Sequence, residues 1–82
     1  MKVVLYSRLG CHLCQQAEEM LLFHCPTALV IDIDQSADLQ RAYGLRVPML
    51  LLAGKIVMEG KFREPDLIEC LARAFKLPGH ES

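Results

Sequence analysis

The sequence predicts a small three-layer α/β domain with the element order βαβαββα and one four-stranded mixed sheet. Its first half alternates a strand, a helix and a strand, and such a unit forms a right-handed crossover between parallel strands. Its second half has two short apolar segments around a glycine, which is typical of an antiparallel hairpin. The 82 residues are 52% hydrophobic and 23% charged, which supports one core and excludes a disordered chain.

A short polar break separates the first strand from the first helix. Residues 2–6 are β-branched and apolar, and residues 7–10 form the break. Beyond Cys11, apolar side chains recur every three or four residues, which predicts an amphipathic helix that begins near Cys11 and cannot continue through Pro26. These apolar positions are Leu13, Cys14, Ala17, Met20, Leu21 and His24.

The second strand and second helix are shorter. Leu29, Ile31 and Ile33 alternate with their neighbours and predict a strand that ends at the polar residues 34–36. A helix is expected over residues 37–43, with Gly44 as a left-handed residue at its C-terminus.

The hairpin and the last helix complete the domain. Residues 49–53 and 55–59 are the two hairpin strands, with Gly54 in the tight connection. The last helix is expected to begin near Pro65, because proline suits the first helical position. We expect the domain to span residues 1–78 and residues 79–82 to fray. The apolar stripe of this helix consists of Leu67, Ile68, Leu71, Ala72 and Phe75.

Charge and hydropathy exclude several classes of function. Nine Lys and Arg against ten Asp and Glu give a formal charge of −1, so no bulk positive field favours nucleic acid or anionic membranes. The apolar runs are much shorter than the roughly 18 residues that a membrane span needs, and the N-terminus lacks the apolar core of a signal peptide. We therefore expect a cytoplasmic monomer that binds neither nucleic acid nor membrane.

The informative motif is Cys11-His12-Leu13-Cys14, at the junction of the first strand and the first helix. A helix N-terminus offers unpaired N–H groups and the positive end of the helix dipole, and both stabilise a thiolate on Cys11. One helical turn places Cys14 beside Cys11 but more buried. This pattern predicts a redox pair with Cys11 as nucleophile and Cys14 as resolving thiol.

Metal binding is the alternative chemistry for these cysteines. His24 and Cys25 could be a second ligand pair for zinc, but they lie at the far end of the helix, roughly 18 Å from Cys11 at 1.5 Å per residue. This separation disfavours zinc, so no metal ligand is assigned. An iron–sulfur cluster that bridges two subunits through Cys11 stays open.

Two separated segments resemble the thioredoxin superfamily, and more narrowly the glutaredoxin-like proteins. Residues 6–14 are similar to the strand, loop and active site of a glutaredoxin, with a basic residue, Arg8, three places before the first cysteine. Residues 39–48 are similar to a second landmark of the family, a helix, a glycine and a Val-Pro before a hairpin. The resemblance covers residues 2–76. It implies a thioredoxin-like sandwich and a thiol–disulfide oxidoreductase.

The resemblance also implies a substrate site. Pro48 would be cis and lie against the Cys11 sulfur, and the Val47 backbone would pair with a bound peptide or glutathione. Residues 60–64 do not reproduce the Gly-Gly-Cys-Asp-like segment with which glutaredoxins hold the γ-glutamyl end of glutathione. Glutathione is therefore a possible reductant or co-substrate, with weak activity expected, and no cofactor is expected to be bound. The expected substrate-binding residues are Arg8, His12, Leu13, Arg46, Val47 and Pro48.

A local basic rim is expected around the site. Arg8, Arg46, Lys61 and Arg63 lie in the three loops that the family brings together, and they would favour an anionic partner, either glutathione carboxylates or an acidic protein segment. Protonated His12 would add positive charge beside Cys11. The expected partners are thus a protein with a disulfide, glutathione, and possible recycling by a thioredoxin-reductase-like enzyme.

Two cysteines lie outside the motif. Cys25 and Cys70 are interpreted as passive apolar side chains. The rival to the enzyme is a non-catalytic module on the same fold, which binds an iron–sulfur or other metal centre, or a partner protein, through the groove between Cys11 and Pro48. Visible absorbance of anaerobically purified protein separates the two, since a cluster absorbs there and a dithiol does not.

Overall fold

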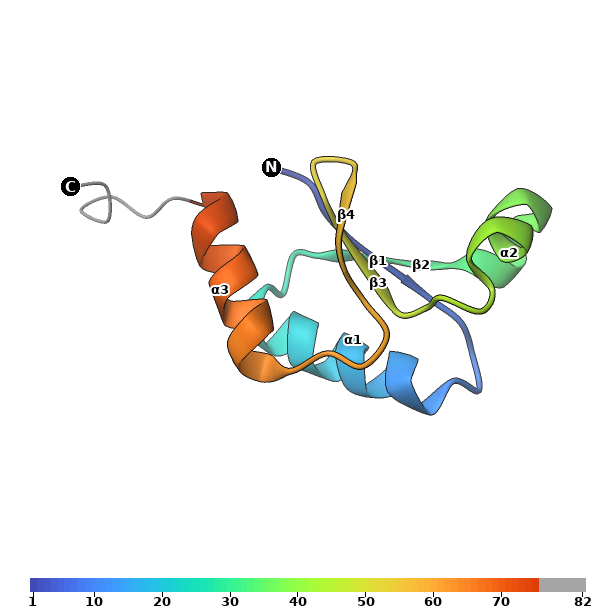
Figure 1. The fold of residues 1–82 in the computed structure, drawn as a ribbon, viewed down its shortest axis with the longest axis horizontal. Coiled ribbons are helices and arrows are strands. Elements are labelled where there is room, and N and C mark those ends of the chain that lie inside the picture. The colour runs from blue at the N-terminus through green and yellow to red at the C-terminus, as the bar shows by residue number, and fades with distance from the viewer. Residues whose placement is uncertain (76–82) are drawn as a thin grey trace.

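The computed structural model describes residues 1–75 and has the expected element order, βαβαββα (Figure 1). The predicted end of the domain at residue 78 and the predicted tail over residues 79–82 lie outside the described residues. No helix within residues 1–75 is long and apolar enough to cross a membrane. The elements are β1 (Val3–Ser7), α1 (His12–His24), β2 (Leu29–Asp32), the 3₁₀ helix η1 (Ile33–Gln35), α2 (Ala37–Tyr43), β3 (Met49–Leu52), β4 (Lys55–Glu59) and α3 (Glu64–Phe75).

The four strands form one mixed sheet in the order β2-β1-β3-β4. β1 pairs in parallel with β2, and β3 pairs antiparallel with both β1 and β4, as the sequence predicts. The β3–β4 turn has positive φ at Ala53 (52°) and Gly54 (82°), the backbone signs of a type I′ hairpin turn. The β3–β4 register shifts by one position, because Leu50 faces Met58 while Leu51 faces Ile56, and this leaves Val57 as a β-bulge.

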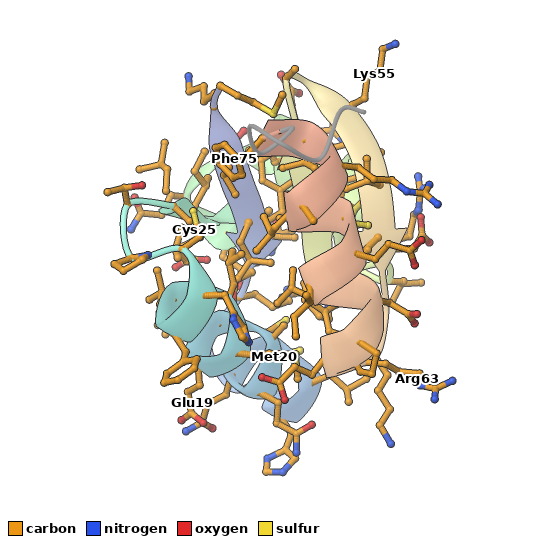
Figure 2. All side chains as sticks on the ribbon, turned by 90° about the vertical axis from the view of Figure 1, so that its left-hand side faces the viewer. Glu19, Met20, Cys25, Lys55, Arg63 and Phe75 are labelled. Carbon is orange, nitrogen blue, oxygen red and sulfur yellow. The ribbon has the colours of Figure 1, made fainter. Side chains whose placement is uncertain are left out.

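Helices cover both faces of the sheet, which makes three layers. On one face, α1 and α3 pack against alternate residues of the strands, with Leu5, Leu21 and Leu67 fully buried. Figure 2 shows α3 beside α1, with Met20 between them. On the other face, Tyr43 of α2 packs against a smaller cluster that contains Met49. The sequence therefore forms one main core under α1 and α3 and a smaller one under α2.

The second strand is shorter than expected. β2 ends at Asp32, and Ile33 is fully buried in η1 instead of continuing the strand. The carboxylate of Asp32 accepts a hydrogen bond from the Asp34 N–H at 2.9 Å, which caps η1 and turns the chain away from the sheet. The alternating pattern was wrong here because a side-chain cap competes with strand extension.

The buried stripe of α3 also differs from the expectation. Leu67 and Leu71 are buried as predicted, but Ile68 and Phe75 are 47% and 46% exposed. Cys70 packs against the main core instead, together with Ala74. The helix is thus rotated so that its buried stripe consists of Leu67, Cys70, Leu71 and Ala74, at spacings of three and four residues.

Gly44 is not left-handed, contrary to the expectation. It ends α2 in the right-handed helical region, with φ −55° and ψ −33°. The need for glycine is one of space, since a Cβ at this position would lie 2.6 Å from the carbonyl oxygen of Gln40 and 3.3 Å from a guanidinium nitrogen of Arg8. A side chain here would displace the end of α2 and also crowd Arg8.

Candidate active site

Cys11 is the N-cap residue of α1. Its backbone is extended, and its Sγ accepts a hydrogen bond from the Cys14 N–H at 3.1 Å. The loop from β1 reaches this position through Gly10, whose φ of 77° suits glycine. The sulfur therefore receives an N–H group at the positive end of the helix, and both favour negative charge on it. Cys11 itself is partly exposed and can be reached by a substrate.

Cys14 lies one turn further along α1 and is fully buried. The pKa of its thiol is raised from 9.0 to about 11, first by burial and then by a hydrogen bond to the Cys11 sulfur, while hydrogen bonds from the Arg8 backbone and the Ser7 side chain oppose the rise. Cys14 is therefore protonated at neutral pH and directed at Cys11. The structure thus brings the two predicted catalytic sulfurs together with different environments.

Pro48 lies at the same end of the sheet as the two cysteines. Tyr6 pairs with Met49, so Pro48 stands beside the end of β1, where the loop to Cys11 begins. The Val47–Pro48 peptide bond is cis, and Pro48 is buried, with its carbonyl oxygen accepting the Gly60 N–H at 2.9 Å. The contact between Pro48 and the Cys11 sulfur that the resemblance implies stays a prediction.

The Val47 backbone, which the resemblance pairs with a substrate backbone, has its N–H group already engaged. It donates to the Tyr43 carbonyl oxygen at 3.2 Å, and the Arg46 N–H donates to the same oxygen at 2.9 Å. These two bonds continue the helical turn of α2 into the loop before β3. Pairing of the Val47 N–H with a ligand must compete with this turn.

Arg8 is bound within the fold. Its Nη2 and Nε donate to the Asp34 carboxylate at 2.8 and 3.2 Å, and its Nη1 donates to the Gly44 carbonyl oxygen at 2.9 Å. The side chain is 30% exposed. Arg8 thereby joins the loop before Cys11 to η1 and to the end of α2, and its carboxylate partner in the structure is Asp34.

Arg46 is also paired. Its Nη2 and Nε donate to Glu59 at 2.7 and 3.3 Å, and its guanidinium carbon lies 5.7 Å from the centre of the Tyr43 ring. Hydrogen bonding to Arg46 holds the pKa of the Glu59 carboxyl below its usual range. Two members of the predicted basic rim are thus neutralised by acidic neighbours, whereas Lys61 and Arg63 are exposed.

Exposed leucines are a feature of the site that sequence reasoning missed. Leu9 is 86% exposed and lines a hollow of about 160 Å³ together with Cys11. Leu45 is fully exposed and lines a second hollow with Arg8. Leu13, predicted as a binding residue, is 39% exposed beside the exposed His12. The sequence signal that could have revealed them is the presence of two leucines, Leu9 and Leu45, in otherwise polar loops.

The residues considered for zinc have other contacts. His24 pairs with Glu64 at 2.6 Å, and Cys25 is buried in the main core. Within residues 1–75, no group of three or more His, Cys, Asp and Glu side chains could hold a metal ion. The zinc ligand set considered from the sequence is therefore not assembled there.

Solved structures with related sequences share this fold. The X-ray structure of Northeast Structural Genomics target protein XcR50 from X. campestris is 39% identical, covers 88% of this chain and 97% of its own, and has a TM-score of 0.77. The solution structure of the same target is 41% identical, with coverages of 90% and 96% and a TM-score of 0.74. No curated protein sequence matches the chain.

A more distant structural match shows the shared fold alone. The holo form of glutaredoxin C1 from populus tremula x tremuloides is 23% identical, covers 93% of this chain and 79% of its own, and has a TM-score of 0.55. This likeness shows a thioredoxin-like fold, as the sequence predicts. The model of the Glutaredoxin-like domain (DUF836) matches residues 2–72, which include the Cys11–Cys14 pair and the Val47–Pro48 bond, and the chain therefore belongs to this glutaredoxin-like family.

Proposed function

We propose that the protein is a thiol–disulfide oxidoreductase in which Cys11 is the nucleophile and Cys14 the resolving thiol. The observation that carries this proposal is the asymmetry of the pair. Cys11 is partly exposed and accepts the Cys14 N–H at 3.1 Å, whereas burial raises the pKa of the Cys14 thiol to about 11. One sulfur is placed to meet a substrate, and the other stays protonated behind it.

The reaction proceeds in two exchanges. The Cys11 thiolate attacks one sulfur of a substrate disulfide, a Cys11–substrate bond forms, and the other substrate sulfur leaves as a thiolate that takes a proton from water. Cys14 then loses its proton, attacks Cys11, and releases the second substrate thiol. The substrate disulfide gains two electrons, and the Cys11–Cys14 pair is oxidised to a disulfide.

A second thiol must reduce this pair again. Two molecules of a low-molecular-weight thiol such as glutathione, which leave as their own disulfide, or one dithiol enzyme of the thioredoxin-reductase type, would attack the Cys11–Cys14 disulfide and restore both thiols. Such a cycle fits the cytoplasm, where cellular thiols are kept reduced. The proposal assigns no bound cofactor and treats the protein as a monomer.

Two single variants test the roles of the cysteines. Cys14→Ser is expected to accumulate a mixed disulfide with a disulfide substrate, whereas Cys11→Ser forms no adduct and loses all activity, as mass spectrometry of the intact variants would establish. Cys70→Ser is the matched control and keeps both activity and the wild-type mass pattern. An adduct on Cys11→Ser but not on Cys14→Ser would reverse the roles.

The same preparations test the rival function. If the chain instead carries an iron–sulfur centre through Cys11, anaerobically purified wild-type protein absorbs in the visible range and Cys11→Ser does not. A colourless wild-type protein that reduces disulfides supports the oxidoreductase. A coloured protein without exchange activity would replace the proposal with the metal-binding module.

A further inference from the structure

We propose that the substrate is a protein disulfide flanked by apolar side chains, in preference to glutathione; this rests on the proposed function and specifies its substrate class. Two exposed leucines lie close to the nucleophilic cysteine in the sequence. Leu9 precedes Cys11 by two residues and is 86% exposed, and Leu13 follows it by two residues and is 39% exposed. Both therefore flank the sulfur on the segment that carries it.

A third exposed leucine lies in the loop between α2 and β3. Leu45 is fully exposed and follows Gly44, whose carbonyl oxygen is bound by the Arg8 guanidinium at 2.9 Å. Arg8 also contributes its backbone to the environment of the Cys14 sulfur. Leu45 is thus tied to the loop that leads into the cysteine pair. Single exposed leucines are common on protein surfaces, but two on the segment that carries the reactive cysteine and a third on the segment bonded to it offer apolar area that a partner can cover.

Two of the four cations of the predicted basic rim, Arg8 and Arg46, are occupied. Arg8 makes two hydrogen bonds to Asp34, and Arg46 makes two to Glu59. A carboxylate of glutathione would have to displace a carboxylate of the protein at either position, which exchanges one ion pair for another. Each of these two arginines is already paired with a carboxylate, so anion binding at them gives little net attraction.

Backbone recognition by Val47 is also weakened, since its N–H donates to the Tyr43 carbonyl oxygen. A tripeptide such as glutathione depends on such polar contacts because it has no large apolar side chain. A protein segment with leucine or phenylalanine next to its cysteine can bury Leu9, Leu13 and Leu45 instead. The free energy of binding is then favoured by the apolar area that is removed from water near the reacting sulfurs.

The test uses the Cys14→Ser protein, in which the reaction stops at the first exchange. Stopped-flow rates are measured with three disulfides: a peptide with leucine on both sides of its cysteine, the same peptide with serine at those positions, and glutathione disulfide. We expect the leucine peptide to react about tenfold faster than the serine peptide, the effect of burying roughly half of a leucine side chain. Alkylation by iodoacetamide measures the reactivity of the Cys11 sulfur separately.

Leu9→Ser and Leu45→Ser, each added to this protein, are expected to lower the leucine-peptide rate several-fold and leave the iodoacetamide rate unchanged. Phe23→Ser is the matched control, because Phe23 is 79% exposed but lies at the other end of α1. A serine peptide or glutathione disulfide that reacts as fast as the leucine peptide overturns the inference and leaves the exchange reaction intact. A protein that reacts with iodoacetamide but with none of the three disulfides overturns the proposed function as well.

Discussion

The guanidinium of Arg8 donates two hydrogen bonds to the carboxylate of Asp34, at 2.8 and 3.2 Å, although the two residues are 26 positions apart in the sequence. A third hydrogen bond from Arg8 reaches the Gly44 carbonyl oxygen. This one side chain therefore connects the loop before Cys11 with the two segments that flank α2. Its main role in the structure is to hold these three segments together.

Arg8→Ala should lower the free energy of unfolding by about 1–2 kcal/mol, because it removes a two-point ion pair and leaves a carbonyl without its donor. Arg8→Lys should recover only part of this, since an ammonium cannot span Asp34 and Gly44 as a planar guanidinium does. Urea denaturation checks both values. Arg41→Ala removes an exposed pair with Asp38 and should cost less than about 0.5 kcal/mol; equal costs for Arg8 and Arg41 would contradict the prediction.

Gly44→Ala should destabilise the protein through the same contact. The new Cβ would lie 2.6 Å from the Gln40 carbonyl oxygen and 3.3 Å from Arg8 Nη1, so the end of α2 and the arginine must both move. We expect a loss of about 1–3 kcal/mol from the crowding. In a double-mutant cycle, Gly44→Ala should cost less when Arg8→Ala is already present, whereas strictly additive values would show that the two residues act independently.

The pH dependence of Cys14 alkylation reports its burial. A thiol with a pKa of about 11 instead of 9.0 has about a hundredfold less thiolate at pH 8, so Cys14 should react slowly with iodoacetamide there. In Cys11→Ser the hydrogen bond between the sulfurs is lost but the burial remains. The rate of Cys14 alkylation in this variant should therefore continue to rise above pH 9, as peptide mapping by mass spectrometry can follow. A rate that levels off near pH 9 would mean that burial does not raise the pKa of this thiol.

Glutathione-dependent turnover in the hydroxyethyl-disulfide assay should be weak compared with an ordinary glutaredoxin measured alongside. The segment over residues 60–64 lacks the γ-glutamyl contacts of the family, and each lost charge-assisted hydrogen bond weakens binding by about 1.5–3 kcal/mol. Arg8→Ala should reduce the remaining activity, because it loosens the loop before Cys11, and Arg41→Ala should not. Turnover at millimolar glutathione equal to that of the reference enzyme would contradict this expectation.

The parts of the site that were predictable depend on residues close in sequence. The position of Cys11 at a helix N-terminus follows from the strand, the polar break and the helical periodicity around it. The burial of Cys14 follows from the same periodicity, because it lies on the face shared with Ala17 and Leu21. These signals are local, and local hydrogen bonds and helix geometry determine the outcome.

The pairing of the arginines was not predictable in this way. Arg8 was expected to bind a ligand, and its partner Asp34 is brought to it only by the β1–β2 pairing and the turn at η1. Arg46 meets Glu59 only because the hairpin folds back beside the loop before β3. The sequence contains ten acidic residues, and which of them becomes the partner of a given arginine is decided by the tertiary fold.

The bulge at Val57 affects the self-association of the protein. β4 is a terminal strand of the sheet and carries apolar side chains at Ile56 and Val57, which are 39% and 41% exposed. A straight strand of this composition would be a template for cross-β polymerisation. The extra residue bends β4 and increases its twist, so a strand added from another molecule cannot keep a regular ladder along it. This irregularity therefore favours a dispersed protein over fibrillar aggregates at high concentration.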